Sequence, residues 1–375
     1  MKNFKSGIYR NQGSYKSFQP NYISRKWLLD DMEIIELLSR ADRTIGRLDM
    51  YSNYIPNIEL FISMHLMKEA TESTKIEGTQ TNMEEALLPR NEVPLNKRDD
   101  WDEVRNYITA MNNAIKDLET LPFSSRLIRK THRQLLQDVR GKNKLPGEFR
   151  RSQNWIGGAT LKDAIFIPPT HTDIPELMGD LEQFVHDETH YFPELLKIAL
   201  VHYQFETIHP FLDGNGRVGR LMITLYLVSK GILKQPILYL SDFFEKNRHH
   251  YFDNLMYVRT QSNIKQWFKF FLVGVIETAK KGILTFDNIL QLQKETDLKI
   301  QNLGSRSSKA KILIEALYIN PLIDAEGVSS ITKTSKSSAY TLIKALEQLG
   351  ILKEISGGKR HKLYLFERYV RLFNS

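Results

Sequence analysis

Residues 209–220 combine residue types that could bind a polyphosphate and move a proton. The helical pattern before them stops at His209-Pro210, because proline cannot continue a helix, so the histidine is expected at the mouth of a loop. An imidazole titrates near neutral pH and could take the proton from an attacking hydroxyl. Glycines flanking an asparagine at the start of the next helix can turn several backbone N–H groups toward one anion. These residues are Gly214, Asn215 and Gly216.

Two arginines and an aspartate indicate that the expected anion is a polyphosphate. Arg217 and Arg220 lie three residues apart on one helix face and lean toward the helix N-terminus. Positive charge there opposes the helix macrodipole by roughly 0.3 to 1 kcal/mol per charge, which a bound anion would offset. Asp213 would repel phosphate alone and is best explained as a ligand for Mg2+ that bridges phosphate oxygens. The expected reaction class is nucleotidyl transfer.

Residues 209–220 also resemble the Fic family motif His-Pro-Phe-x-Asp/Glu-Gly-Asn-Gly-Arg-x-x-Arg at every defined position. The resemblance extends over about residues 5–280. It implies an enzyme that binds Mg-ATP and transfers AMP to a Tyr, Ser or Thr hydroxyl of a protein, with release of pyrophosphate. In that scheme His209 is the general base, and Asp213 the magnesium ligand. The implied phosphate contacts are Gly214, Asn215, Gly216, Arg217 and, on the γ-phosphate, Arg220.

Residues 154–169 interrupt the helical patterns with a glycine pair, an apolar run and two prolines, which indicates a short β-hairpin. One interpretation is a structural hairpin that caps a helical bundle. The family resemblance implies instead a flap that pairs with the backbone of the target protein and holds its hydroxyl in line. The flap residues are then Ile156, Gly157, Gly158, Ile165, Phe166 and Ile167.

A second segment, Ser73-Thr74-Lys75-Ile76-Glu77-Gly78, resembles the inhibitory motif Ser/Thr-x-x-x-Glu-Gly/Asn of the same family. Taken alone, Glu77 could be an ordinary surface carboxylate. The resemblance implies that Ser73 and Glu77 belong to an inhibitory helix at about residues 65–88. A carboxylate paired with Arg220 would occupy the cation that the γ-phosphate needs. Inhibition within one chain or across a homodimer, and removal of AMP by the same glutamate, both stay open.

The adenine site is sought in residues 247–255, which resemble the family segment where an aromatic side chain stacks on the base. Tyr251 is the first choice for that contact, and Asn254 is a weaker one. The alternative is that both side chains pack their helix.

The last 75 residues carry most of the chain's positive charge. Residues 301–375 hold 12 Lys+Arg and 6 Asp+Glu, so they account for +6 of the net charge of +8. Three helical patterns with a tight turn, followed by a hairpin, predict a winged helix-turn-helix over residues 305–375. DNA is one expected partner of this unit, and dimerisation or protein docking is the alternative. The candidate DNA contacts are Lys333, Lys336, Lys344, Lys359 and Arg360.

The remaining segments must position these groups, and most read as helices. Apolar residues recur at three and four from residue 30 to about 88, and again over 100–118, 125–136, 174–187, 194–207, 217–230 and 243–281. Residues 1–25 lack this spacing and are expected to form an extended arm, and the polar stretch 291–304 is expected to separate off the last unit. We expect a mainly α fold, a Fic helical bundle with a short flap, divided into 1–110, 111–290 and 305–375.

Composition excludes several classes of function. The chain has no cysteine, which excludes thiolate chemistry and cysteine-based zinc sites and leaves hard cations such as Mg2+. No apolar run reaches the roughly 18 residues of a membrane helix, so a cytoplasmic protein without a membrane partner is expected. The leading hypothesis is a self-inhibited protein adenylyltransferase. The alternatives are a nucleotide-sensing transcriptional regulator and an enzyme of the same fold that uses another nucleotide donor.

Overall fold

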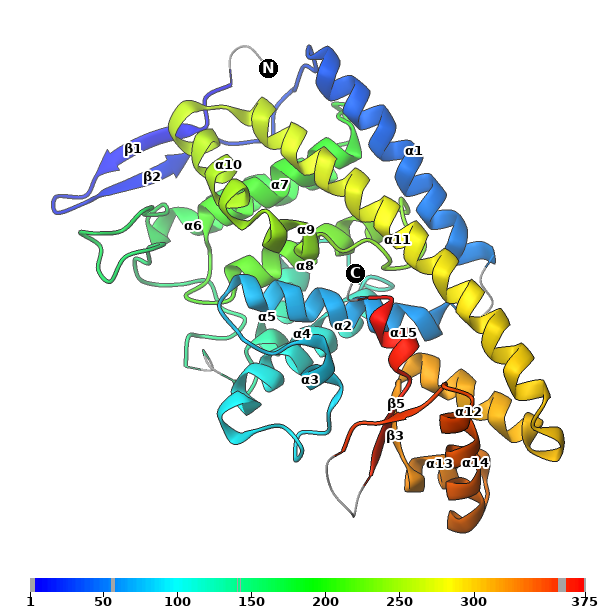
Figure 1. Cartoon of the computed structure of the whole chain (residues 1–375). Coiled ribbons are helices and arrows are strands. Elements are labelled where there is room, and N and C mark those ends of the chain that lie inside the picture. The colour runs from blue at the N-terminus through cyan, green and yellow to red at the C-terminus, as the bar shows by residue number, and fades with distance from the viewer. Residues whose placement is uncertain (1–3, 55–57, 140, 142, 357–361, 374–375) are drawn as a thin grey trace.

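A computed structural model describes residues 4–54, 58–139, 141, 143–356 and 362–373, and it is mainly helical (Figure 1). The N-terminal segment is not the extended arm expected from the sequence. It forms an antiparallel hairpin of β1 (Gly7–Asn11) and β2 (Lys16–Pro20). The hairpin docks because Phe18, which is 1% exposed, packs inward and its N–H donates to the Ile167 carbonyl at 2.8 Å. Cross-strand pairing thus satisfies backbone groups that an isolated arm would leave to water.

The bulk of the chain is a layered helical bundle. Two long helices, α1 and α11, run side by side along one flank (Figure 1). Helices α7 and α8 occupy the centre, and they are buried on nearly all sides, as expected for helices surrounded by other elements. The bounds are α1 (Met32–Tyr54), α2 (Glu59–Ile76), α3 (Met83–Leu87), α4 (Arg98–Asp117), α5 (Ser125–Leu135), α6 (Ile174–His186), α7 (Glu194–Ile208), α8 (Asn215–Ser229), α9 (Ser241–Lys246), α10 (Arg248–Gln261) and α11 (Ile264–Gln301). Short 3-10 turns occupy Leu95–Lys97, His171–Asp173 and Gly304–Arg306.

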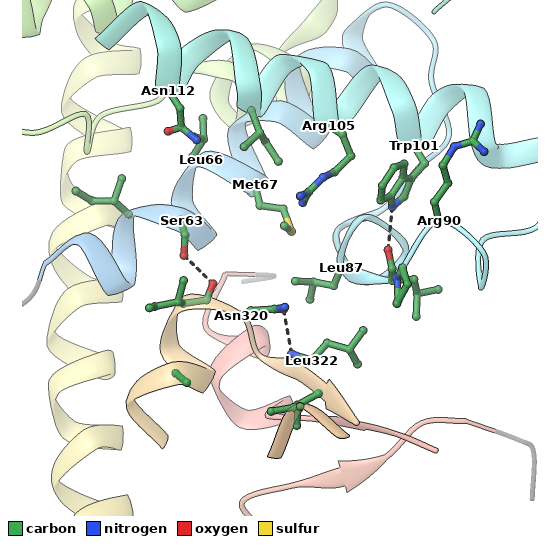
Figure 2. A pocket seen from close by; sticks show the side chains of 18 of the residues that line it. Ser63, Leu66, Met67, Leu87, Arg90, Trp101, Arg105, Asn112, Asn320 and Leu322 are labelled. Carbon is green, nitrogen blue, oxygen red and sulfur yellow. Dashed lines mark hydrogen bonds between the residues drawn. The ribbon is translucent and has the colours of Figure 1, made fainter. Parts of the chain in front are cut away.

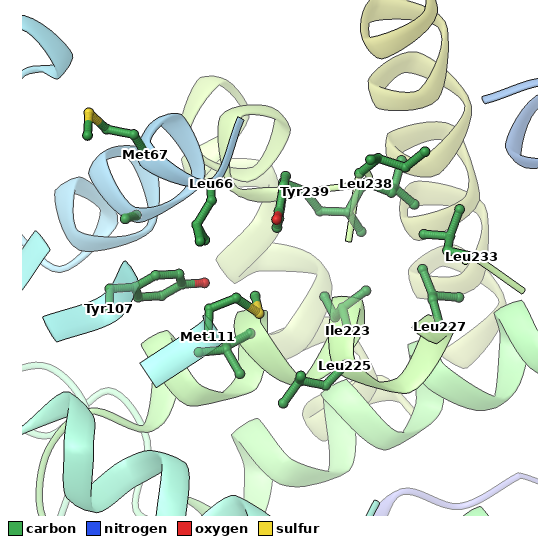
Figure 3. Close-up of a cluster of buried hydrophobic side chains, with 14 of the residues drawn as sticks. Leu66, Met67, Tyr107, Met111, Ile223, Leu225, Leu227, Leu233, Leu238 and Tyr239 are labelled. Carbon is green, nitrogen blue, oxygen red and sulfur yellow. The ribbon is translucent and has the colours of Figure 1, made fainter. Parts of the chain in front are cut away.

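One part of the core joins α2, α4 and α8. Figure 3 shows Leu66 of α2, Tyr107 and Met111 of α4, and Ile223 and Leu225 of α8 converging there. The side chains of these five residues are each no more than 2% exposed. Burial of this kind contributes roughly 1.5–3 kcal/mol for each large apolar side chain. The core therefore fixes α8, which begins at the glycine-rich loop, against α2, which ends beside it.

Two helix predictions need correction. The inhibitory helix expected over 65–88 is two helices, because α2 ends at Ile76, and α3 starts after the N-cap Asn82, which forms a capping box with Glu85. The pattern at 243–281 is likewise three helices, and its breaks fall at Asn247 and at Ser262, which takes a left-handed conformation.

The polar stretch 291–304 is also not a linker. Helix α11 continues through it to Gln301, because Leu292, Thr296 and Ile300 are buried on one face. Helices α4 and α11 run through the expected boundaries at 110 and 290, so these cuts do not fall between elements. The division into domains stays a prediction.

The C-terminal unit, which begins at residue 305, contains four helices and a small antiparallel sheet among its described residues. Its elements are α12 (Ser307–Ile319), β3 (Leu322–Asp324), α13 (Ala325–Thr332), α14 (Lys336–Gln348), β4 (Lys353–Glu354), β5 (Leu363–Leu365) and α15 (Glu367–Arg371). The strand order is β3-β5-β4, with Ile323 opposite Tyr364 and Glu354 opposite Tyr364. The helices and hairpin follow the expected order, and the assignment as a winged helix-turn-helix stays a prediction. Lys359 and Arg360 lie outside the described residues.

Within the described part of the chain, no helix is both long enough and apolar enough to span a membrane.

Candidate active site

The loop between α7 and α8 combines a strained backbone residue with side-chain hydrogen bonds that close it. His209 follows the last turn of α7 with φ 50° and ψ 60°, a left-handed conformation that costs energy for a residue with a side chain. The Asn215 side chain closes the loop, because its Oδ1 accepts from the Phe211 N–H at 2.8 Å and its Nδ2 donates to the Phe211 carbonyl at 2.9 Å. Asn215 therefore shapes the nest through its side chain, and its own backbone N–H opens α8.

The His209 imidazole is held as a neutral base. Burial, together with the nearby positive charges of Arg259 and Arg150, lowers its pKa to about 3. At neutral pH the ring is therefore unprotonated at one nitrogen and can accept a proton. Its Nδ1 is buried with no hydrogen-bond partner among the described residues.

A second histidine, His132 of α5, supports the loop through hydrogen bonds and a ring contact. Its Nδ1 accepts from the Gly147 N–H at 2.8 Å, so the ring proton lies on Nε2, which donates to the Asp213 carbonyl at 2.9 Å. The ring also stacks on Phe211 with centroids 3.7 Å apart. His132 thus fixes the backbone immediately before Gly214.

Arg217 and Arg220 both face carboxylates in this structure. Arg217 Nη1 donates to Glu103 Oε2 of α4 at 2.9 Å, and its Nη2 donates to Asp213 Oδ1 at 3.2 Å. Arg220 Nη2 donates to Glu77 Oε1 at 2.7 Å and to the Ser73 carbonyl at 2.8 Å, while its Nε donates to Ser73 Oγ at 2.9 Å. The predicted inhibitory pair, Ser73 and Glu77, therefore lies on the predicted γ-phosphate ligand.

The Glu77 carboxylate also covers the anion nest. A Cβ placed on Gly216 would lie 2.3 Å from Glu77 Oε1, so only glycine allows this approach. Partial removal from water acts to raise the pKa of Glu77, but the charge of Arg220 outweighs it and holds the pKa below its usual value. The Glu77 side chain stays 38% exposed, whereas that of Arg220 is 1% exposed. Because the Glu77 side chain is the more exposed of the two, it can leave the ion pair more easily than Arg220.

Asp213 suits a hard cation by its chemistry and its position. Its Oδ1 accepts from the Gly214 N–H at 2.6 Å and from Arg217, and 39% of its side chain is exposed beside the nest. No group of three or more potential metal-ligating side chains occurs among the described residues. A single exposed carboxylate such as that of Asp213 fits Mg2+, which commonly takes one or two carboxylates and completes its shell with phosphate oxygens and water.

The flap prediction corresponds to a short hairpin. Ile156 and Phe166 form an antiparallel bridge, and the intervening turn is closed by the Asp163 carboxylate. Ile165 is 70% exposed, while Phe166 is 2% exposed and lies under the Arg259 guanidinium at 3.9 Å from the ring centre. Gly157 and Gly158 both take left-handed backbone conformations, and Ile167 bonds to β2.

The adenine predictions find less support in this structure. Tyr251 is 1% exposed, stacks on Phe244 at 4.5 Å and bonds through its hydroxyl to His202 Nε2 at 2.9 Å. Its ring packs in the core and offers no open face for a base. Asn254 is 5% exposed, donates to the His250 carbonyl at 2.7 Å, and keeps a buried Oδ1 without a partner among the described residues. Both adenine contacts stay predictions.

The site is also held together by residues that the sequence did not single out. Arg150, Asn154 and Arg259 all donate to backbone carbonyls around His209, and Glu103 balances Arg217. The only sequence signal was the placement of Arg150 and Asn154 beside the expected flap. Carbonyl partners leave no mark in a sequence, because every residue has one.

A cleft that is separate from this site lies between α2, α4 and the C-terminal unit (Figure 2). It has a volume of about 1110 Å³, and Leu66, Met67, Trp101 and Leu322 are among its lining residues. Ser63 Oγ of α2 donates across it to the Ile319 carbonyl of α12 at 3.0 Å. None of the predicted catalytic or phosphate-binding residues lines this cleft.

The fold and the loop thus define a class of helical proteins with an anion-binding turn and a flap. Comparison with known proteins gives the family: residues 35–116 match the family model for the Fic/DOC family N-terminal region, and residues 122–227 match that for the Fic/DOC family. The chain belongs to the Fic/DOC family.

Similar proteins carry the same fold. A protein adenylyltransferase Fic of Aedes aegypti is 33% identical over 125 residues, which cover 33% of this chain and 22% of that protein. One from Drosophila melanogaster is 38% identical over 86 residues, which cover 23% of this chain and 16% of that protein. The chain therefore spans about a fifth of these relatives. A Fic family protein structure from Desulfovibrio desulfuricans G20 superposes with a TM-score of 0.59 at 17% identity, covering 91% of this chain and 98% of that one.

Proposed function

We propose that this protein transfers AMP from ATP to a hydroxyl of a protein and that Glu77 holds it in an inhibited state. One observation carries the proposal: the His209 imidazole stands at the mouth of a glycine-rich turn whose two arginines each bind a carboxylate. The relatives named protein adenylyltransferase share the Fic domain and support the same reaction.

In the proposed reaction His209 accepts the proton of the attacking hydroxyl. The hydroxyl oxygen forms a bond to the α-phosphorus of ATP, the bond from that phosphorus to the bridging oxygen breaks, and pyrophosphate leaves. The N–H groups at Gly214, Asn215 and Gly216 would face phosphate oxygens, and Arg217 and Arg220 would balance their charge. Asp213 would hold Mg2+, which supplies charge neutralisation on the phosphates when bound.

Inhibition follows from competition for one cation. Arg220 can bind the Glu77 carboxylate or a γ-phosphate, and the carboxylate also covers Gly216. Replacing Glu77 with glycine would free both the guanidinium and the nest. ATP could then adopt a pose suitable for in-line attack.

The test is incubation with ATP labelled on the α-phosphate, Mg2+ and a cell lysate. Glu77→Gly should raise labelling of this protein or of lysate proteins at least about tenfold, which corresponds to 1.4 kcal/mol of released inhibition. His209→Ala in the Glu77→Gly background should lower it by about 10²-fold or more. Glu72→Gly, at a partly exposed position of α2 whose carboxylate pairs with Lys75 and not with Arg220, is the matched control and should leave labelling unchanged.

Labelling that ignores both Glu77 and His209 would contradict the proposal. Mass spectrometry of the labelled protein identifies the transferred group, so UMP, GMP or phosphocholine would correct the donor. Prior labelling followed by loss that depends on Glu77 would reveal removal of AMP.

A second candidate function, DNA binding by the C-terminal unit, is favoured by one observation. Helix α14 and the turn before it expose Lys333, Lys336 and Lys344, and the unit carries most of the chain's net charge. Band shifts on genomic fragments should weaken steeply as salt rises, and Lys344→Glu should weaken them further, while Lys280→Glu on α11 should not. No shift at low salt would remove this candidate.

A further inference from the structure

Arg150 occupies an unusual place between the flap and the catalytic turn. It is 2% exposed, and its guanidinium is surrounded by backbone carbonyls. On the flap side, Nη1 donates to the Ser152 carbonyl at 3.0 Å and Nη2 to the Pro169 carbonyl at 2.6 Å. On the catalytic side, Nε donates to the His209 carbonyl at 3.0 Å and Nη2 reaches the Ile208 carbonyl at 3.5 Å. One side chain therefore joins both ends of the flap segment to the general base.

The planar fork of arginine is what makes this possible. Five N–H donors in a fixed geometry can bond several carbonyls at once, which a lysine ammonium on a flexible stem cannot reproduce. Its own backbone N–H adds a bond to the Pro210 carbonyl at 2.9 Å. All of the hydrogen bonds that Arg150 makes to described residues go to carbonyl oxygens.

The flap has few backbone bonds of its own and depends on bonds to its surroundings, among them those from Phe18 of β2 and from Gln153. Its strands share a single bridge at Ile156 and Phe166, and an isolated two-stranded hairpin is marginally stable at best. Asn154 adds bonds from the start of the flap to the His209 and Phe211 carbonyls at 3.3 and 2.9 Å. Arg259 holds the Phe166 ring and donates to the Glu206 carbonyl at 3.0 Å. Among these three side chains, only Arg150 bonds both flap ends.

We propose that Arg150 is a positioning residue that sets the distance and angle between the flap and His209. This inference rests on the proposed function, in which the flap carries the acceptor segment of a protein substrate. A hydroxyl held by the flap must meet the phosphorus within a narrow range, and a misplacement of about 1 Å can cost about 10²-fold in rate. By bonding to both, Arg150 holds the flap and the loop at His209 in one fixed arrangement.

The charge of Arg150 has a second effect at the same place. With Arg259 it places positive charge beside the His209 imidazole, and both charges lower the pKa of that ring. A lysine at position 150 would keep the charge but lose the carbonyl cage, whereas a glutamine would lose both. These two variants therefore separate geometry from electrostatics.

The first measurement is amide hydrogen exchange on full-length Arg150→Lys, which needs no substrate. The amides of Ile156 and Phe166, which bond across the flap, should exchange at least about tenfold faster than in the parent protein, while amides in the middle of α8 should not change. Arg151→Lys is the matched control, since Arg151 is the exposed neighbour and should leave the flap amides as they are. Unchanged flap amides in Arg150→Lys would overturn the proposal.

The second measurement is the rate of self-labelling with labelled ATP in the Glu77→Gly background. Arg150→Lys should lower the maximal rate by about 10²-fold and leave the KM for ATP within about twofold, because the nest is untouched. Arg150→Gln should in addition raise the pKa of His209, read from the imidazole ¹⁵N shifts with His209→Ala as the assignment standard. Full activity of Arg150→Lys, or a KM for ATP that rises with the loss of rate, would contradict a positioning role.

The two measurements distinguish the failure of the inference from the failure of the proposed function. An unlabelled Glu77→Gly parent would count against nucleotide transfer, while the flap exchange would still report on Arg150. A labelled parent with an insensitive Arg150→Lys variant would count against Arg150 alone.

Discussion

The proposed catalytic loop, residues 209–220, and the C-terminal unit both contain several positive charges. The two regions differ in how far these charged side chains are buried. In the loop, Arg217 and Arg220 are at most 4% exposed, and each has more than one partner. In the C-terminal unit, Lys336 pairs with Glu326, and both side chains are more than two-thirds exposed. Buried charge requires partners that remove the cost of leaving water, while exposed charge does not. The number of cations therefore says little about function until their burial is known.

The largest expected difference between the two regions is in stability. Arg220→Ala leaves the Glu77 carboxylate and the Ser73 carbonyl without their donor and opens space in the core. We expect a loss of about 2–3 kcal/mol in the free energy of unfolding, less than for a fully buried pair because Glu77 stays partly in water. Urea denaturation measures it. A loss well under 1 kcal/mol would mean that the pair is only a surface contact.

Acid should sharpen the same comparison, with a smaller effect for each pH unit. The folded pKa of His209 is lowered to about 3, below the ordinary value of 6.5, so between these values the unfolded chain binds a proton that the folded chain does not. Stability therefore falls as pH falls through this window, by about 1.4 kcal/mol per pH unit near pH 5. His209→Ala should remove that slope for one proton, measured by urea denaturation at several pH values. An unchanged slope would show that His209 is protonated in the fold.

His65, His132 and His202 behave alike, since burial lowers their pKa values to about 3, 4 and 3. All four histidines lie outside residues 305–375. Acid should accordingly weaken the Fic part of the chain before it weakens the C-terminal unit. Near-ultraviolet signals from Trp267, which lies beside His202, would follow that loss.

The smallest expected effect belongs to the C-terminal unit. Lys336→Ala removes an exposed ion pair and should leave the denaturation midpoint unchanged within error. A clear drop would mean that the surface cations of this unit have a structural role, which would weaken their assignment to DNA.

The loop between α7 and α8 could be located from the sequence because its residues are contiguous and of distinctive types, while their catalytic roles stay predictions. The sequence also paired Glu77 with Arg220 across more than a hundred residues through a second motif. It could not anticipate that Tyr251 is enclosed, since that follows from packing against Phe244 and a hydrogen bond to His202. The continuation of α11 was also hidden, because few of the residues in 291–304 are apolar and their burial depends on neighbouring helices.

Helix α2 gives the molecule one more property. Near its start, Phe61 and His65 pack on Tyr318 and Phe373 of the C-terminal unit, and at its other end Ser73 and Glu77 bond Arg220. A movement of α2 as a rigid body away from Arg220 would also shift its contacts with Tyr318 and Phe373. Under the proposed function, a ligand of the C-terminal unit that shifts this contact would change the affinity for ATP by some factor, and by thermodynamic reciprocity ATP would change the affinity for that ligand by the same factor.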